Sequence, residues 1–211
     1  MLNKEELRLL KRKMTFTGRG QVTVNPDLAI IRLGVQTTGE NVNAAQQENA
    51  RISSQILNAV KGLGVNNIKT FQYQIEKLVD YENGNRVDRG FSVRNIFEIK
   101  TENLGQVGPI IDTAVLNGAN LVEFINFDVA HPDTYYQQAL NLAVKNAYQK
   151  AKTVASSLKF TFDPIPVLIT ENVIPAVPYS ASFAVREGAY ATPIESGSKQ
   201  IEAYVTVDFI Y

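Results

Sequence analysis

The hydrophobic residues of this chain follow two different periods, and the switch between them limits the possible folds more than any other feature. A period of two indicates a strand with one buried face, whereas a period of about 3.6 indicates an amphipathic helix. The pattern predicts strands over 16–24, 29–36, 68–79, 90–101, 121–129, 165–170 and 201–209. It predicts helices over 42–62, 104–117 and 133–158. We therefore expect an α+β fold in the order β-β-α-β-β-α-β-α-β-β.

The middle of this order, β-α-β-β-α-β, is that of a ferredoxin-like unit. We expect an antiparallel or mixed sheet that contains this portion, together with a long third helix and extra C-terminal strands. Residues 25–27 (Asn-Pro-Asp) are expected to join the first two strands into a hairpin, and residues 83–84 (Asn-Gly) to form a tight turn. Asn41 or Asn43 can cap the first helix, and the regular second helix is expected to begin near Pro109.

Few residues in the chain can carry catalytic or metal chemistry. The absence of cysteine excludes disulfides, thiol nucleophiles and thiolate metal sites. The one histidine, His131, has no second histidine or cysteine to complete a metal site or a catalytic dyad. Asp80, Glu82 and Asp88 are close in sequence but lack the spacing of a calcium-binding loop. We therefore expect no catalytic residue, no metal site and no cofactor.

Two further patterns are interpreted as structural. Gly18-Arg19-Gly20 lacks the third glycine and the following helix of a dinucleotide-binding loop, so the glycines are expected to serve a β-bulge or close packing. Aromatic residues on the predicted strands could form a stacking platform for bases, but the balanced charge favours core packing. These residues are Phe71, Tyr73, Phe91, Phe97, Phe124 and Phe127.

The charges balance, with 21 basic and 21 acidic residues. Nucleic-acid-binding proteins usually carry a basic excess, so we expect no nucleic-acid partner. Residues 1–13 favour a short helix and contain a basic run over 11–13, which is interpreted as a solvated helix end or tail. They lack the apolar stretch of a secretory signal, and no segment approaches the ~20 apolar residues of a membrane span. As written, the chain is expected to be cytoplasmic unless a leader has been removed.

Residues 171–199 form a long stretch rich in proline, alanine and aromatic residues. Such long stretches are uncommon in compact domains and tend to be functional or disordered. Prolines limit the conformational entropy lost on ordering, and aromatic side chains anchor interfaces. The candidate interface residues are Pro175, Pro178, Tyr179, Phe183, Tyr190 and Pro193. The alternative is that the stretch folds back and covers an edge of the chain's own sheet.

Several short motifs, in their order and spacing, resemble the SIMPL-domain family. They are Gly18 and Gly20 followed by residues 26–29 (Pro-Asp-Leu-Ala), then 34–35, Ala44, Ala45 and Asn49, 62–64, 107–108, 111–112, 118–119, the alanines of the third helix, and 192–197. The resemblance covers about residues 15–211 and leaves a charged segment over 1–14. The chain departs from the family at Ser196, where proline is frequent, and at Pro109, and as written it is expected to lack the leader of most relatives.

This resemblance implies an α+β domain of unknown function in a family of mostly periplasmic or cell-surface proteins. Its periplasmic immunogenic members resemble ring-like or channel-like homo-oligomers, some relatives are linked to stress tolerance, and no enzyme activity is established across the family. We expect a non-enzymatic assembly or interaction domain that binds itself or another protein, linked to the cell envelope or to stress response. The alternative is a small-ligand-binding protein with a pocket between the sheet and the third helix. An enzyme that uses an unrecognised carboxylate or tyrosine site is a third, less favoured reading.

Overall fold

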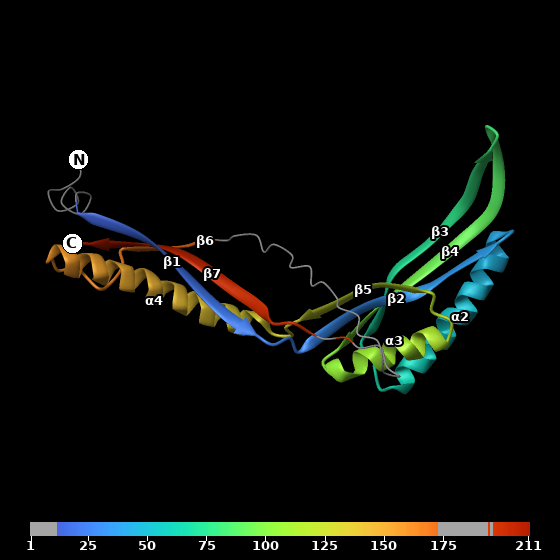
Figure 1. Cartoon of the computed structure of the whole chain (residues 1–211), viewed down its shortest axis with the longest axis horizontal. Helices are drawn as coiled ribbons and strands as arrows, with labels where there is room; N and C mark the ends of the chain where they lie inside the picture. Colours follow the sequence, from blue (N-terminus) through green and yellow to red (C-terminus); the bar gives the residue numbers. More distant parts are fainter. Residues whose placement is uncertain (1–11, 173–193, 195) are drawn as a thin grey trace. The chain divides into compact units, whose positions relative to one another are not determined.

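The computed structural model describes residues 12–172, 194 and 196–211, which form two compact units (Figure 1). The first unit contains 12–25, 131–172 and 198–211, and the second contains the described residues of 26–130 and 194–197. Both are built from antiparallel sheets and helices, which confirms the expected α+β class. The expected division into a segment over 1–14 and a domain over 15–211 stays a prediction.

The first unit is a three-stranded antiparallel sheet with one long helix on it (Figure 1). Its strands are β1 (Lys13–Val24), β7 (Lys199–Ile210) and β6 (Leu168–Asn172), in the order β1-β7-β6, and its helix is α4 (Pro132–Leu158). Small residues on α4 meet apolar residues of β7 in one buried cluster. The cluster consists of Ala139, Ala143, Ala147, Ala151, Ala203, Val205, Val207 and Phe209. Residue 13 already belongs to β1, so the helix expected over 1–13 does not extend to it.

Helix α4 approaches β1 so closely that only glycine fits at two positions of the strand. A Cβ atom on Gly18 would lie 2.0 Å from the carbonyl oxygen of Ala143, and one on Gly20 would lie 1.9 Å from that of Ala139. Pairing between β1 and β7 runs without a register shift, so there is no bulge here. Of the two roles expected for these glycines, close packing is confirmed.

The hairpin expected from the first two strands is wrong. β1 pairs with β7, whereas β2 (Leu28–Gly39) pairs with β4 and β5 in the second unit. Asp27 explains why the turn residues do not fold β2 back onto β1. Its backbone N–H donates to the carbonyl oxygen of Asp128, and its side chain accepts from the N–H of Ala130, so the start of β2 is fixed beside the end of β5.

The second unit is a four-stranded antiparallel sheet in the order β3-β4-β2-β5, with two helices packed into one core against it. The register places Ile31 opposite Ile99 and Leu33 opposite Phe97 on the helix side. The ferredoxin-like assignment of this portion stays a prediction. Besides β2, its elements are α2 (Val42–Gly62), β3 (Ile68–Glu82), β4 (Asn85–Thr101), the short 3₁₀ helix η1 (Leu104–Gln106), α3 (Val107–Leu116) and β5 (Leu121–Asp128).

Local signals set the helix boundaries largely as expected. The side chain of Asn41 accepts a hydrogen bond from the N–H of Ala44 and caps α2, which decides between the two expected caps. Pro109 lies in the first turn of α3, as expected for a regular helix that begins near it.

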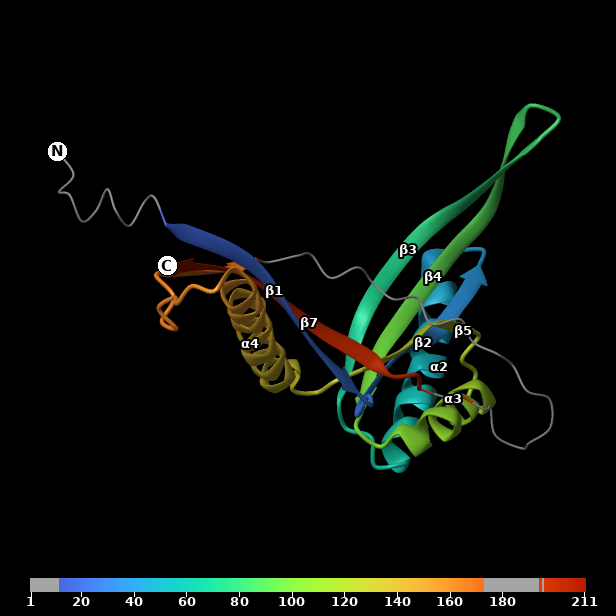
Figure 2. The same ribbon diagram turned by 60° about the vertical axis from the view of Figure 1, so that its left-hand side comes forward.

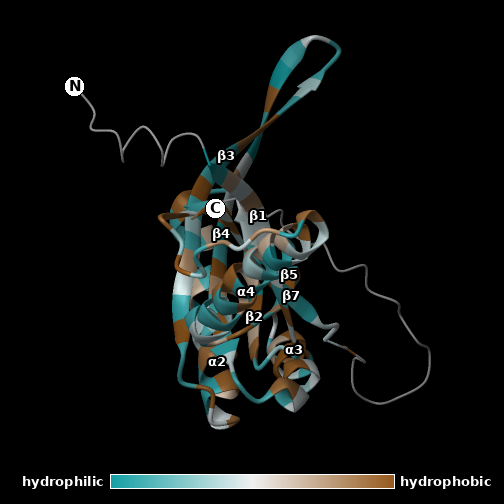
Figure 3. Ribbon diagram, turned by 90° about the vertical axis from the view of Figure 1, so that its left-hand side faces the viewer, coloured by the Kyte–Doolittle hydropathy of each residue, from teal (hydrophilic) through white to brown (hydrophobic). Residues whose placement is uncertain are grey.

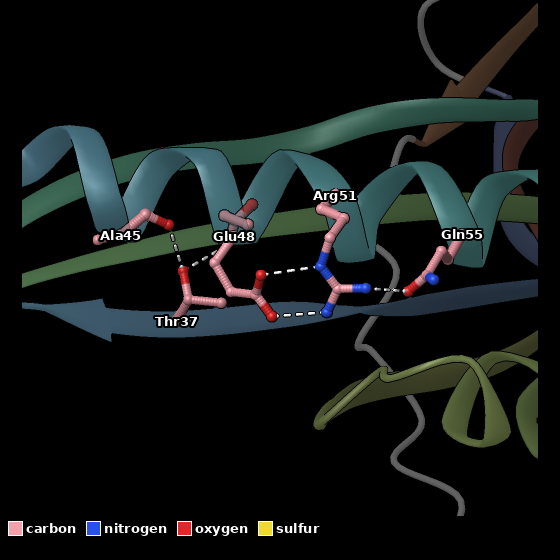
Figure 4. Close-up of polar contacts among 6 residues, drawn as sticks. Thr37, Ala45, Glu48, Arg51 and Gln55 are labelled. Carbon is pink, nitrogen blue, oxygen red and sulfur yellow. Dashed lines mark hydrogen bonds and ion pairs between the residues drawn. The ribbon is translucent and has the colours of Figure 1, made fainter.

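Helix α2 is attached to the central strands by buried polar contacts as well as by its apolar face. The hydroxyl of Thr37 on β2 donates to the carbonyl oxygen of Ala45 at 2.8 Å, and the outer side of the helix carries a row of side-chain bonds from Glu48 through Arg51 to Gln55 (Figure 4). Deeper in the contact, the amide of Asn49 donates to the carbonyl oxygen of Val93 at 2.8 Å. These bonds fix the helix in one register on the sheet.

Candidate interaction surface

One face of the four-stranded sheet carries an ordered cluster of charged and aromatic side chains. The apolar residues of α2 and α3 pack on the opposite face. No helix packs on the face that carries Arg32 and Glu98, as far as the structure describes this unit, and we call it the open face. Strand alternation places Arg32 on this face, directly opposite Glu98 in the β2–β4 register.

Arg32 and Lys69 both bind the carboxylate of Glu98. The Nε and Nη2 atoms of Arg32 donate to Oε2 of Glu98 at 3.0 and 2.8 Å, and Nζ of Lys69 lies 3.0 Å from Oε1. The Glu98 side chain is only 6% exposed although it lies on the open face. The carboxylate is therefore largely removed from water, although no helix packs on this face in the described part of the unit.

Two phenylalanines complete this arrangement. The guanidinium carbon of Arg32 lies 3.6 Å from the ring centre of Phe71 and 5.1 Å from that of Phe124. Phe71 is 45% exposed and Phe124 is 41% exposed. We call Arg32, Lys69, Phe71, Glu98 and Phe124 the Arg32 cluster.

Register shifts in both flanking strands lie beside these rings. β3 has an extra residue between Thr70 and Gln72 in its pairing with β4, and this residue is Phe71. On the other side, the pairing of β2 with β5 shifts after Arg32, beside Phe124. Bulges of this kind redirect side chains and are frequent next to functional sites. Alternation from Lys69, which contacts Glu98, already places Phe71 on the open face, so the register shift falls at Phe71 without changing the face of this residue.

Hydrogen bonds from Arg32 and then from Lys69 hold the pKa of Glu98 below its ordinary value of 4.5, while burial opposes this shift. A carboxyl with a lowered folded-state pKa stabilises the fold above its unfolded pKa, and the contribution is lost as pH falls through the folded pKa. We predict that Glu98→Gln lowers the free energy of unfolding by about 1 kcal/mol at pH 7. The loss is modest because Lys69 is exposed, so water screens its attraction to Glu98. The deficit should shrink below about pH 4.5, as urea unfolding at several pH values would show.

The matched control is Glu102→Gln, which alters an exposed glutamate with no ion pair among the described residues. Its urea midpoint should follow that of the unaltered chain at every pH. If the loss of stability in Glu98→Gln stays constant down to pH 3, the negative charge of Glu98 does not stabilise the cluster.

The β3–β4 hairpin continues beyond the end of β2 as a two-stranded ribbon (Figures 1 and 2). Asn83 and Gly84 form its turn with φ angles of 51° and 82°, as the sequence predicts for a tight hairpin turn. Its tip is largely hydrophilic (Figure 3). The acidic residues near this turn form ion pairs with basic side chains: Asp88 lies 2.6 Å from Lys77, and Arg89 contacts Asp80 and Glu82.

The other residues singled out in the sequence lie apart from the Arg32 cluster. His131 is an exposed residue before α4 and makes no side-chain capping bond. Within the described ranges, no three acidic or histidine side chains come together in a way that could hold a metal ion. No helix in the part of the chain that the structure describes is long and apolar enough to cross a membrane.

The expectation that strand aromatics pack in the core holds only in part. Phe97 is buried and Phe127 packs partly against the core, whereas Phe71, Tyr73 and Phe124 are between 41% and 48% exposed. For these three residues the expectation is wrong, because two of them lie at the open face and all three lie on the outer strands of the sheet.

The expected interface residues Pro175, Pro178, Tyr179, Phe183, Tyr190 and Pro193 all lie outside the described residues. The pocket expected between the sheet and the third helix would fall between β1 or β7 and α4. At Gly18 and Gly20 the strand is in contact with the backbone of α4, which leaves no space for a ligand at these two positions. Ligand binding elsewhere stays a prediction.

Comparison with known proteins gives consistent results over most of the chain. The family model SIMPL, described as a protein of unknown function, matches residues 14–209. The 26 kDa periplasmic immunogenic protein of Brucella melitensis is 28% identical over 152 residues, which are 69% of this chain and 61% of that protein. The uncharacterized protein YggE of Escherichia coli (strain K12) is 22% identical over 151 residues, covering 71% of this chain and 61% of YggE. The chain thus spans about three fifths of the length of these curated relatives.

Proposed function

The chain belongs to the SIMPL family, and we propose that it is a non-enzymatic assembly protein that binds further copies of itself through the open face of its four-stranded sheet. The observation that supports this proposal is the Arg32 cluster, in which a fixed arginine lies against two half-exposed phenylalanine rings. The description of the Brucella relative as periplasmic extends the proposal to a role in the cell envelope.

The Arg32 cluster has the composition of an interface anchor. Arginine and aromatic residues are enriched at the energetically important centres of protein interfaces. Glu98 holds the guanidinium of Arg32 by two hydrogen bonds, and the rings limit its movement. A partner that covers this side chain therefore causes little further loss of side-chain entropy, which favours binding.

A second copy of the chain is the proposed partner because the open face carries both signs of charge. Arg32 and Lys69 surround Glu98, and Arg94 pairs with Glu123 on β5. In a two-fold dimer the same patch faces itself, so a patch of one sign would repel its own copy. A patch with balanced charge avoids this repulsion.

We expect the unaltered chain to elute at a multiple of its 23.4 kDa mass on a sizing column with light-scattering detection. The double variant Phe71→Ala with Phe124→Ala should shift the mass toward the monomer, because it removes the apolar part of the anchor. Leu116→Ala is the control, since Leu116 is 86% exposed at the end of α3 and belongs to the helix side. A monomeric unaltered chain, or an unchanged mass for the double variant, would contradict the proposal.

As part of this proposal, we expect no enzymatic activity and a link to stress response. The ligand-binding alternative has no observation among the described residues that favours it over assembly.

A further inference from the structure

The first unit ends in a patch of exposed apolar side chains that the proposed assembly does not use. The patch lies where α4, the loop that follows it and the C-terminal end of β7 meet (Figures 1 and 2). Leu158, Ile165, Val167, Leu168 and Tyr211 are between 43% and 72% exposed. We call these residues, with Phe160, the apolar end. An exposed group of this kind in a folded chain indicates a binding surface for a partner or a membrane.

Backbone hydrogen bonds hold the apolar end in place. The N–H of Asp163 donates to the carbonyl oxygen of Ile210 at 3.0 Å, and that of Val167 donates to the carbonyl oxygen of Asp208 at 2.9 Å. These bonds fix the loop of residues 159–167 along the end of β7. The rings of Phe160 and Tyr211 are 4.5 Å apart, so the two ends of the patch are in contact.

The exposed charges that we compare at the apolar end are positive on Arg12 and Lys159 and negative on Asp163, which leaves a net positive charge. Arg12 and Lys159 are exposed, and neither forms an ion pair with any residue that the structure describes. Asp208 is buried, and hydrogen bonds from Lys13 and Thr15 lower its pKa. Its negative charge is thereby withdrawn from the surface and neutralised by Lys13.

We propose that the apolar end binds the surface of membranes that contain anionic phospholipids. The apolar side chains would enter the boundary between headgroups and acyl chains, and Arg12 and Lys159 would lie against lipid phosphates. Tyr211 suits this depth because its ring is apolar and its hydroxyl is polar. The backbone of the loop over 159–167 needs water or headgroups as hydrogen-bond partners, so binding is interfacial and not spanning.

Charge also distinguishes a membrane from a second copy of the chain as the occupant. The net positive charge of Arg12, Lys159 and Asp163 would repel its own copy across a two-fold axis, whereas an anionic lipid surface attracts it. The open face of the sheet is the opposite case, because its charges are balanced within the patch. The two surfaces therefore suit different partners.

The test is co-sedimentation of the full chain with vesicles of phosphatidylcholine, with and without phosphatidylglycerol. We expect binding to the vesicles with phosphatidylglycerol to be at least about tenfold stronger, and to weaken as salt is added. Ile165→Asp with Val167→Asp should lower this binding by about tenfold or more by placing charges in the apolar contact. Arg12→Glu with Lys159→Glu should abolish the preference for phosphatidylglycerol.

Val115→Asp with Leu116→Asp is the matched control, because it adds the same two charges at exposed apolar residues of the second unit and should leave vesicle binding unchanged. Circular dichroism establishes that each variant is folded. Equal binding to both vesicle types, or none, would overturn the proposal. A lower native mass of the lipid-free Ile165→Asp, Val167→Asp variant would assign the patch to a protein interface instead. Phe71→Ala with Phe124→Ala must keep vesicle binding, so failure of the assembly proposal is distinguishable from failure of this one.

Discussion

Gly20→Val is expected to lower the free energy of unfolding of the first unit by about 3 kcal/mol or more. A Cβ atom at this position would lie 1.9 Å from the carbonyl oxygen of Ala139 and 2.5 Å from the backbone nitrogen of Ala143. Both are backbone atoms in the interior of α4, so they cannot move aside as a flexible side chain would. The larger residue must lift the helix from β1 and expose the alanine and valine cluster beneath it.

Urea unfolding followed by circular dichroism measures this loss, and hydrogen exchange of peptides from α4 and β1 locates it in the first unit. Gly62→Ala is the control, because Gly62 ends α2 with no atom within 4 Å of the added Cβ and with an ordinary negative φ. We expect it to be neutral or to stabilise by up to about 1 kcal/mol. A wild-type urea midpoint for Gly20→Val would mean that α4 does not pack on β1 as described.

The elements of this fold are predictable from the sequence to within a few residues, because their signals are local. Helix α2 has the predicted bounds, with Asn41 as its cap, and residues 83–84 form the predicted turn. The partners of the strands are not predictable in this way. Alternation on β1 shows that one face is buried, but it does not show that β7, from the far end of the chain, covers its edge. β1 and β2 are neighbours in the sequence but not in a sheet, which is why the predicted hairpin does not form.

The Arg32 cluster is hidden from sequence analysis for a related reason. Its strands are predicted, and Arg32 falls on the polar side of β2 by alternation. Phe71 and Arg32, however, lie on strands separated by β4, and alternation within a strand does not show which strands lie side by side. The order of the strands in a sheet leaves no mark in the sequence, so Phe71 and Phe124 are counted with the core. The close fit of Gly20 on α4 is predictable in part, because a glycine in a strand indicates a close approach of another backbone. The sequence does not show that this backbone belongs to α4.

Asn49→Ala is expected to lower the free energy of unfolding by about 2–3 kcal/mol, which is large for a side chain of this size. Asn49 is 1% exposed, and the family resemblance includes it without assigning a role. Its amide nitrogen lies 2.8 Å from the carbonyl oxygen of Val93 on β4 and 3.2 Å from that of Val35 on β2. Its side-chain oxygen accepts a bond from the hydroxyl of Ser53. One side chain thus fastens α2 to both central strands.

A second variant separates the contribution of the side-chain volume at Asn49 from that of its hydrogen-bond donor. Asn49→Asp keeps the volume but replaces the donor with an acidic group that faces two carbonyl oxygens. Burial and this repulsion should raise the folded-state pKa of the introduced carboxyl, so the variant loses stability as pH rises above its unfolded pKa of about 3.9. Urea unfolding from pH 3 to 7 should show a decline for Asn49→Asp that Asn49→Ala does not share.

Asn58→Ala, at an exposed position of the same helix, should change the stability by less than about 0.5 kcal/mol and controls for helix propensity. If Asn49→Asp is as stable as the unaltered chain at pH 7, the two strand carbonyls do not need the amide donor. The apolar face of α2 would then hold the helix on the sheet, and the hydroxyls of Thr37 and Ser53 would add little to the stability. If the decline is found, a polar contact inside the core sets the position of α2 on the sheet whose other side carries the Arg32 cluster.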